Sequence, residues 1–394
     1  MGGFDVSDIS VGIPQDDELE AFAAQHRRTY NWTQDRYDEE VASLGERVRD
    51  LRIVRHNGRV AGGLSLIPMG QWFGGRSIPM VGIGGVGVDP RERASGLASA
   101  LMRSVIEELL ASGVALSALY PATQPVYRRA GYELAGQYVS YSQDAKTIDV
   151  RDRALPVELC DPIERDTFVP MYNVRAQCSN GNLDRSERFW RRIVDNPKGD
   201  VHAYVVGDGE GYVVFRQLSE KGWGYDLALR DVVALTPAAA RRLWTFFADH
   251  RSFAGKVKWN GPPGDPFAFH LREQEWDVEK VWAWMLRIVD VERALAERGY
   301  PAALEAELHL RVSDDVLSAN DGSFVLNVSD GKAEVSRGGR GSLRVDVRGL
   351  SPLYTGFQSA EALVSTGLVE GPDTDLAVAT AIFGGPAPWL ADFF

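Results

Sequence analysis

Hydrophobic positions in the first 150 residues follow two alternating periods, that of an amphipathic helix and that of a strand. Apolar residues at helical spacing over 19–26 predict a helix, and two apolar runs around the turn His56-Asn57-Gly58 predict a β-hairpin. A glycine-rich strand over 80–88, a helix over 97–109, and strands over 114–120 and 132–141 follow. This order predicts an α/β fold, a mixed sheet layered with helices.

The same order of elements recurs over residues 151–289. Two apolar runs flank a turn at 207–211, a strand is predicted over 225–235, and Thr236 with Pro237 marks a helix start. Threonine is a favoured N-cap and proline a favoured first helical residue. The junction reads Thr-Pro-Ala-Ala-Ala, where the first copy has a glycine loop. We interpret 151–289 as a diverged duplicate without the ligand-binding loop.

Residues 290–394 have a different pattern. A helix over 291–298 and alternating stretches at 307–312, 322–328 and 342–347 predict an α+β module. We interpret the Arg-Gly-Gly-Arg-Gly stretch at 337–341 as a hairpin loop. The chain ends Trp-Leu-Ala-Asp-Phe-Phe, and aromatic side chains are costly to leave in water, so we expect the tail to dock on the protein. The sequence therefore divides into three domains, 1–150, 151–289 and 290–394.

Composition narrows the classes of function. Forty-three basic and 55 acidic residues give a net charge of -12, which lacks the basic footprint of a nucleic-acid-binding protein. Cys160 and Cys178 cannot form a disulfide framework, and they and the scattered histidines have no metal-site spacing. No apolar run approaches a membrane span, and the first residues do not resemble an export signal. We expect a cytoplasmic protein that binds no metal, nucleic acid or membrane.

Residues 93–98 carry the clearest indication of a binding site. They read R-x-x-G-x-A, between a strand ending Val86-Gly87-Val88 and a long amphipathic helix. Gly96 permits a tight turn after which the amides of the first helical turn point outward. These donors and the positive end of the helix dipole suit a pyrophosphate. The alternative is an N-cap loop with an incidental glycine.

A GxGxxG pattern at 82–87 overlaps the preceding strand. A dinucleotide site needs such glycines at the turn that opens a helix, and here they lie within the strand. We interpret this segment as a strand whose glycines lack side chains, so that a ligand can approach its backbone.

Tyr127 opens a Y-x-x-x-G-Y sequence after the next strand, a position from which a phenol can reach a leaving sulfur. Together the splayed strand, the R-x-x-G-x-A loop and this tyrosine resemble the general-control N-acetyltransferase (GNAT) superfamily. The duplicate and the C-terminal module resemble the enhanced intracellular survival (Eis) family of actinobacterial acetyltransferases, in which two GNAT-type domains precede a sterol carrier protein 2-like domain. The segment Gly349–Phe357 and the ending Asp392-Phe393-Phe394 carry the C-terminal part of this resemblance.

The resemblance implies a catalytic GNAT domain over 1–150, a degenerate one over 151–289, and a sterol carrier protein 2-like domain over 290–394. It implies acetyl transfer from acetyl-coenzyme A to amines of cationic small molecules, notably aminoglycosides at several positions, by a homohexamer. The residues expected at the coenzyme are Val86, Gly87, Val88, Arg93, Ala94, Ser95, Gly96, Leu97, Ala98, Ser99, Ala122 and Thr123. Gly84 and Gly85 depart from the family, which has a larger side chain beside the substrate channel.

Two residues are expected to move protons. The phenol of Tyr127, with an ordinary pKa near 10, is protonated at neutral pH and could act as general acid to a thiolate of pKa about 8.5. The resemblance implies that the α-carboxylate of Phe394 accepts the proton of the attacking amine. For Tyr127 the alternative is a core aromatic, and for the tail it is docking for stability alone.

Two other functions stay open at this point. The first is acetylation of protein lysines. The second is a lipid or sterol carrier that uses residues 290–394 and performs no chemistry. The R-x-x-G-x-A loop and Tyr127 favour chemistry, because a carrier needs neither.

Overall fold

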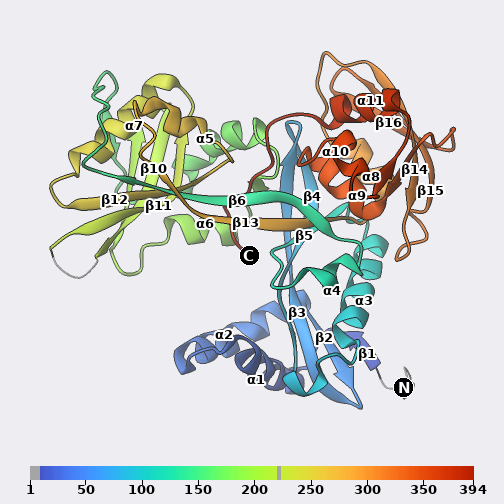
Figure 1. Cartoon of the computed structure of the whole chain (residues 1–394). Helices are drawn as coiled ribbons and strands as arrows, with labels where there is room; N and C mark the ends of the chain where they lie inside the picture. Colours follow the sequence, from blue (N-terminus) through green and yellow to red (C-terminus); the bar gives the residue numbers. More distant parts are fainter. Residues whose placement is uncertain (1–8, 220–222) are drawn as a thin grey trace.

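The computed structural model describes residues 9–219 and 223–394 (Figure 1). Its strands form a 13-stranded sheet through the middle of the molecule and a five-stranded sheet near the C-terminus. Helices cover both sheets, which confirms the predicted mixed α/β architecture.

The first unit contains the predicted helix, hairpin, glycine-rich strand and second helix. Asn57 and Gly58 both have positive φ, as the two central residues of a tight hairpin turn require. The elements are β1 (Ile9–Gly12), α1 (Leu19–Tyr30), α2 (Gln34–Arg47), β2 (Leu51–His56), β3 (Arg59–Phe73), β4 (Arg76–Val88), α3 (Leu97–Ala111), β5 (Leu116–Leu119), α4 (Gln124–Arg128) and β6 (Glu133–Asp144).

The second unit repeats this order. Thr236 caps α7 as predicted, because its hydroxyl accepts a hydrogen bond from the Ala239 amide at 3.1 Å and Pro237 is the first helical residue. The elements are β7 (Val157–Leu159), α5 (Arg165–Gln177), β8 (Leu183–Asp184), α6 (Glu187–Val194), β9 (Val201–Val206), β10 (Gly211–Ser219), β11 (Tyr225–Ala234), α7 (Pro237–Asp249), β12 (Ala254–Gly261) and β13 (Asp277–Ile288).

The two units exchange their last strands. The sheet order around the centre is β4-β5-β13-β6-β12-β11, so β13 of the second unit lies against β5 of the first, and β6 of the first lies against β12 of the second. Figure 1 shows β6 and β13 crossing the middle of the molecule together. The changes of pattern near 150 and 289 therefore do not separate two independent sheets.

The third unit packs against the central strands β6 and β13 through α9. Its elements are α8 (Val291–Glu297), β14 (Ala306–Ser313), β15 (Gly322–Ser329), β16 (Lys332–Arg337), β17 (Leu343–Asp346), α9 (Val347–Thr355), α10 (Ala360–Val364), β18 (Val369–Glu370) and α11 (Asp373–Phe383). The hairpin interpretation of 337–341 is wrong. The loop joins β16 to β17, but β17 pairs in parallel with β14 on the other side of the sheet, so the loop is a crossover.

The C-terminal tail returns from the third unit to the centre of the molecule. Trp389 forms a bridge with Gln137 of β6, and the Leu390 amide donates to the Gln137 carbonyl at 3.0 Å. The last residue, Phe394, then lies between Phe189 of α6 and Gly82 of β4. The tail is therefore docked, as its aromatic composition predicts.

Candidate active site

Strand β4 separates from β5 in the first unit. The two strands pair in parallel only over Met80–Gly82, whereas β4 stays paired with β3 as far as Val88. From Ile83 onward, the edge of β4 on the β5 side therefore has no pairing with β5. The separated edge is consistent with the interpretation of this glycine-rich segment as a strand whose backbone a ligand approaches, an interpretation that stays a prediction.

A β-bulge marks the separated part of β4. Ser65 faces Gly84 and Gly63 faces Gly87, so Gly85 and Val86 together oppose a single residue of β3. Gly85 has φ +63, a conformation that glycine adopts without a steric cost.

Helix α1 holds this bulge by two hydrogen bonds. The His26 Nε2 atom lies 2.6 Å from the Gly85 carbonyl oxygen, and the Tyr30 hydroxyl donates to the Val86 carbonyl at 2.7 Å. His26 and Tyr30 are four residues apart and so lie on one face of the helix. The sequence predicts a helix over 19–26, which ends in His26, but it does not indicate a partner for this side chain.

The predicted loop joins β4 to α3 through a short 3-10 turn, Pro90–Glu92. Asp89 is buried and fixes the turn, since its carboxylate accepts from the Arg91 amide at 3.0 Å and forms ion pairs with Arg91 and Arg28. These contacts hold the pKa of Asp89 well below its usual range, with the Arg91 hydrogen bond the largest cause.

The loop itself has the geometry that a pyrophosphate needs. Ala94 and Gly96 have positive φ, and Gly96 is the N-cap of α3, so no capping side chain covers the first-turn amides. A Cβ added to Gly96 would meet no atom within 4 Å, so the approach is open. Arg93 is exposed beside it. Residues 93–99 therefore fit a pyrophosphate bound to backbone N–H groups.

Tyr127 lies on α4, after the exposed residues Ala122 and Thr123. Its side chain is buried and packs edge to face against Tyr132, with 6.3 Å between ring centroids. Burial raises the pKa of Tyr127 to about 12, above the ordinary value expected from the sequence. Burial and then the proximity of Tyr127 raise the pKa of Tyr30. Tyr127 belongs to the hydrophobic core that α3 covers.

The terminal carboxyl group lies beside the same strand. The carboxyl carbon of Phe394 is 3.7 Å from the position that a Cβ would occupy on Gly84, and the Phe394 ring covers Gly82. The ring packs edge to face against Tyr120 and Phe189 at 5.7 and 6.2 Å. The glycines of β4 thus leave the space that the last residue fills.

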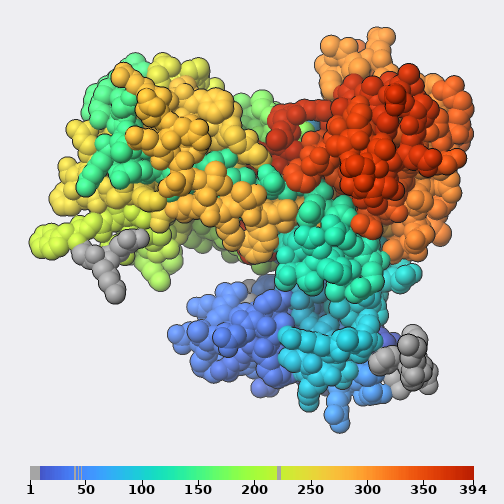
Figure 2. Space-filling model, in the orientation of Figure 1, coloured from blue at the N-terminus to red at the C-terminus, as the bar shows by residue number. Residues whose placement is uncertain are grey.

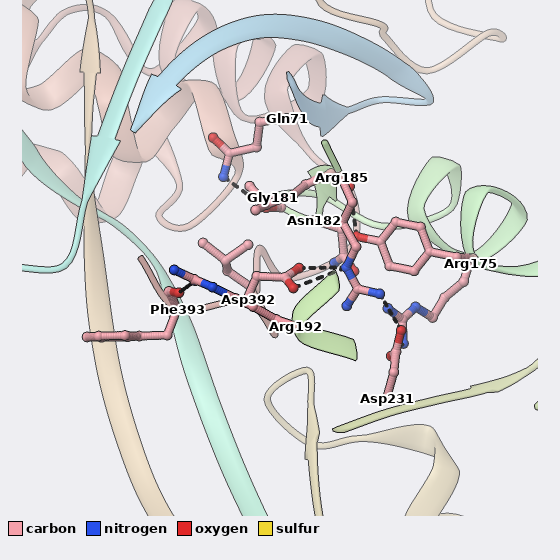
Figure 3. Close-up of polar contacts among 12 residues, drawn as sticks. Gln71, Arg175, Gly181, Asn182, Arg185, Arg192, Asp231, Asp392 and Phe393 are labelled. Carbon is pink, nitrogen blue, oxygen red and sulfur yellow. Dashed lines mark hydrogen bonds and ion pairs between the residues drawn. The ribbon is translucent and has the colours of Figure 1, made fainter. Parts of the chain in front are cut away.

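Charged and polar groups that sequence reasoning missed surround the tail (Figure 3). The Arg192 guanidinium donates to the Phe393 carbonyl at 2.7 Å, and the Tyr120 hydroxyl donates to the Asp392 carbonyl at 3.0 Å. Burial, partly offset by Asp392, lowers the pKa of Arg192. Arg192 and its neighbours come from the second unit, far from the tail in sequence, and no local pattern marks them.

The second unit has the same strand separation without the loop. Strand β11 pairs with β12 only as far as Ala228 but continues to Ala234. A cavity of about 370 Å³ lies there, lined by Thr236, Pro237, Asp265 and Trp389 of the tail, among others. The Thr236 hydroxyl already caps one first-turn amide of α7 and Pro237 has none, so fewer donors remain than at α3.

Within residues 9–219 and 223–394, no cluster of three or more His, Cys, Asp or Glu side chains could hold a metal ion. In the same part of the chain, every helix is too short or too polar to cross a membrane.

Comparison with protein families places the three units. Residues 12–135 and 181–288 each match an acetyltransferase (GNAT) domain, and residues 291–391 match a sterol carrier protein domain. Uncharacterized N-acetyltransferases of Streptomyces griseus and Streptomyces avermitilis are 29% and 28% identical, over 82% of this chain and 83% of each relative.

Solved structures agree over nearly the whole chain. A GCN5-related N-acetyltransferase from Anabaena variabilis is 36% identical with a TM-score of 0.93, covering 98% of this chain and 100% of that one. One from Kribbella flavida is 30% identical with a TM-score of 0.89, covering 98% of both chains. Eis1 from Mycobacterium abscessus, 22% identical with a TM-score of 0.79 over 98% of this chain and 100% of its own, shares the fold. The tandem GNAT and sterol carrier architecture is thereby confirmed, and the chain belongs to the GCN5-related N-acetyltransferases, enzymes that use acetyl-coenzyme A.

Proposed function

We propose that this acetyltransferase acts on amines of cationic small molecules, with aminoglycosides as the first class to test. One observation carries the proposal: the carboxyl terminus of the chain lies beside Gly84, on the strand that separates from β5. An α-carboxyl group has an unperturbed pKa of roughly 3.3–3.7, so it is ionised at neutral pH and attracts an ammonium group. A protein lysine and a carried lipid remain the competing ligands.

Acetyl-coenzyme A supplies the acetyl thioester. We propose that the amides after Gly96 bind its pyrophosphate, with Arg93 adjacent, and that Val86 to Val88 together with Ala122 and Thr123 line the rest of its path. The open approach to Gly96 and the bulge held by His26 and Tyr30 support this assignment.

Two proton transfers complete the reaction. The Phe394 carboxylate accepts a proton from the amine, directly or through water, as the new carbon–nitrogen bond forms. Tyr127 donates its phenolic proton to the sulfur as the carbon–sulfur bond breaks. The raised pKa keeps Tyr127 protonated at neutral pH, although it also makes the phenol a weaker acid than an exposed tyrosine.

A thiol-release assay with acetyl-coenzyme A tests the acceptor class. The arms are an aminoglycoside, a histone-like peptide and a no-acceptor control, with a fluorescent fatty acid in a separate binding measurement. Thiol release that depends on the aminoglycoside supports the proposal. Release with the peptide alone would move the assignment to protein lysines, and fatty-acid binding without any release would favour a carrier.

Arg192 gives a reason to add a third acceptor. Its guanidinium lies beside the last peptide group, where it could pair with the carboxylate of an amine that also bears one. A higher kcat/KM for such an amine than for the aminoglycoside would narrow the acceptor class to amines that also bear a carboxylate.

Figure 2 shows a hollow in the surface between the α1–α2 lobe and the second unit, and we propose that the acceptor enters there.

The remaining proposals concern assembly and domain roles. We propose a cytoplasmic homohexamer with catalysis in residues 1–150, a degenerate unit at 151–289 and a sterol carrier protein 2-like unit at 290–394. Light scattering tests the hexamer. Calorimetry with coenzyme A tests the domain roles, because a degenerate second unit predicts one coenzyme per chain and two would contradict it.

A further inference from the structure

The end of the tail is held by a buried charge as well as by its aromatic rings. Asp392 lies two residues before the terminus, and its side chain is 6% exposed. The Arg185 Nε atom donates to both carboxylate oxygens of Asp392, at 3.1 and 3.0 Å (Figure 3). The contact joins the tail to the segment between β8 and α6 of the second unit.

Arg185 is fixed on its other side. Its Nη1 atom pairs with the carboxylate of Asp231 on β11, which also accepts from the Tyr212 hydroxyl at 2.7 Å and pairs with Arg175 at 3.1 Å. The Arg185 guanidinium lies 4.0 Å from the centre of the Tyr172 ring. A guanidinium held by two carboxylates and an aromatic face has one orientation, and Asp392 takes its position from it.

Stability alone does not account for such a contact. Removing two charges from water costs about as much as their attraction returns, and an apolar pair of similar volume would anchor a tail equally well. What the ion pair adds is direction, because the Nε–H of the fixed guanidinium is shared between both oxygens of Asp392. Two residues of chain span at most about 7 Å, so fixing Asp392 confines the carboxylate of Phe394 to a small region beside β4.

We infer that Arg185 is a positioning residue for the terminal carboxylate, and that the second unit, which lacks the coenzyme loop, serves the reaction as the structure that orients the tail. The inference rests on the proposed role of the Phe394 carboxylate as proton acceptor. Arg185 acts through Asp392 and contacts no substrate. The acceptor class affected is any amine that enters as an ammonium ion.

The test compares isosteric changes at two buried ion pairs in the full chain. Asp392→Asn removes the charge that Arg185 holds. Asp314→Asn is the matched control, because Asp314 and Arg287 form a buried pair with both side chains 0% exposed and neither contacts the tail. Arg185→Lys, which keeps the charge but loses the planar guanidinium that joins Asp392 to Asp231, is a second variant in case Asp392→Asn does not fold.

Asp392→Asn is expected to lower kcat by about 10²-fold at pH 7, since a misplacement of about 1 Å at a reacting group has an effect of this size. The KM for acetyl-coenzyme A should stay unchanged. The deficit should shrink between pH 7 and 9, because the amine then loses its proton to solvent instead of to the carboxylate. Arg185→Lys should show a smaller loss with the same pH dependence, and Asp314→Asn should lower the melting temperature but keep the wild-type pH profile.

The outcomes separate this inference from the proposed function. A chain extended by a few residues beyond Phe394 tests the carboxylate itself, and full activity in that chain would overturn the proton-acceptor proposal. If the extended chain is inactive while Asp392→Asn or Arg185→Lys keeps the wild-type kcat and pH profile, the positioning role of Arg185 is wrong and the proposed function stands.

Discussion

A methyl group on Gly82 is expected to displace Phe394, whose carboxylate is the proposed proton acceptor. A Cβ at Gly82 would lie 2.7 Å from Cε2 of the Phe394 ring and 2.5 Å from Cε of Met69. Met69 is flexible at that atom and can move aside. The Phe394 ring must retreat to an ordinary contact distance, a shift of about 1 Å, which at a reacting group corresponds to a loss in kcat of about 10²-fold.

Gly84→Ala is the matched control, two residues along the same face of β4. Its Cβ would lie 3.7 Å from the Phe394 carboxyl carbon, an ordinary contact, and 3.2 Å from the mobile Cδ1 of Ile67. We expect Gly84→Ala to keep kcat close to wild type, although the added methyl raises KM for bulky acceptors. The assay is acetyl transfer at saturating acetyl-coenzyme A, with melting temperature and coenzyme affinity measured in parallel. Equal kcat values for Gly82→Ala and Gly84→Ala, in folded proteins, would refute the argument from tail position.

Three further outcomes are expected. In a titration, Gly96→Asp should weaken coenzyme A binding about tenfold relative to the control Gly96→Asn. Both replacements share the strain of φ +83, but only aspartate places a negative charge at the helix N-terminus, where it repels the pyrophosphate. Tyr127→Phe should keep coenzyme affinity and lower turnover by about 10²–10⁴, and an unchanged turnover would leave Tyr127 as packing only. Burial alone would raise the pKa of Asp231, but Arg185 and Arg175 outweigh it and hold that pKa below its usual range. The stabilisation that the ionised Asp231 contributes is therefore complete above the unfolded-state pKa near 3.9, and it is lost as pH falls through the folded-state pKa. Asp231→Asn should lower the free energy of unfolding at neutral pH by about 3–5 kcal/mol. In urea titrations at a series of acidic pH values, the free energy of unfolding of this variant should also change less with pH than that of the wild type.

The parts of the fold that the sequence predicted depend on neighbouring residues. The Thr236 cap, the Asn57-Gly58 turn and the glycine N-cap at Gly96 are each decided within four or five positions, and each is present in the structure. The loop at 337–341 shows the limit. Two alternating stretches joined by a short glycine-rich segment resemble a hairpin, but only the pairing of β17 with β14 decides that the loop is a crossover.

The parts that could not be predicted depend on distant contacts. The ion pair between Arg185 and Asp392 joins residues 207 positions apart, and neither residue lies in a recognisable motif. Tyr30, which holds the bulge at Val86, lies beyond the helix predicted over 19–26, and no pattern near it indicates a partner 56 residues away. Tyr127 was located from the sequence, but its raised pKa depends on burial by neighbours that only the folded chain supplies.

The exchange of β6 and β13 has a consequence for the order in which the protein is made. Strand β13 pairs with β5 at Leu116–Leu119 through its last residues, Met285–Ile288, so the first sheet lacks its neighbour on that side until about 170 further residues have left the ribosome. Until then the edge of β5 is exposed, and exposed edges invite pairing with other chains. Contacts of such long sequence separation also slow folding, because the loop must close before they form. A ribosome that stalls within the second unit would therefore release a first unit in which the edge of β5 is unpaired. The first unit is protected from edge-to-edge aggregation only after synthesis has passed residue 288.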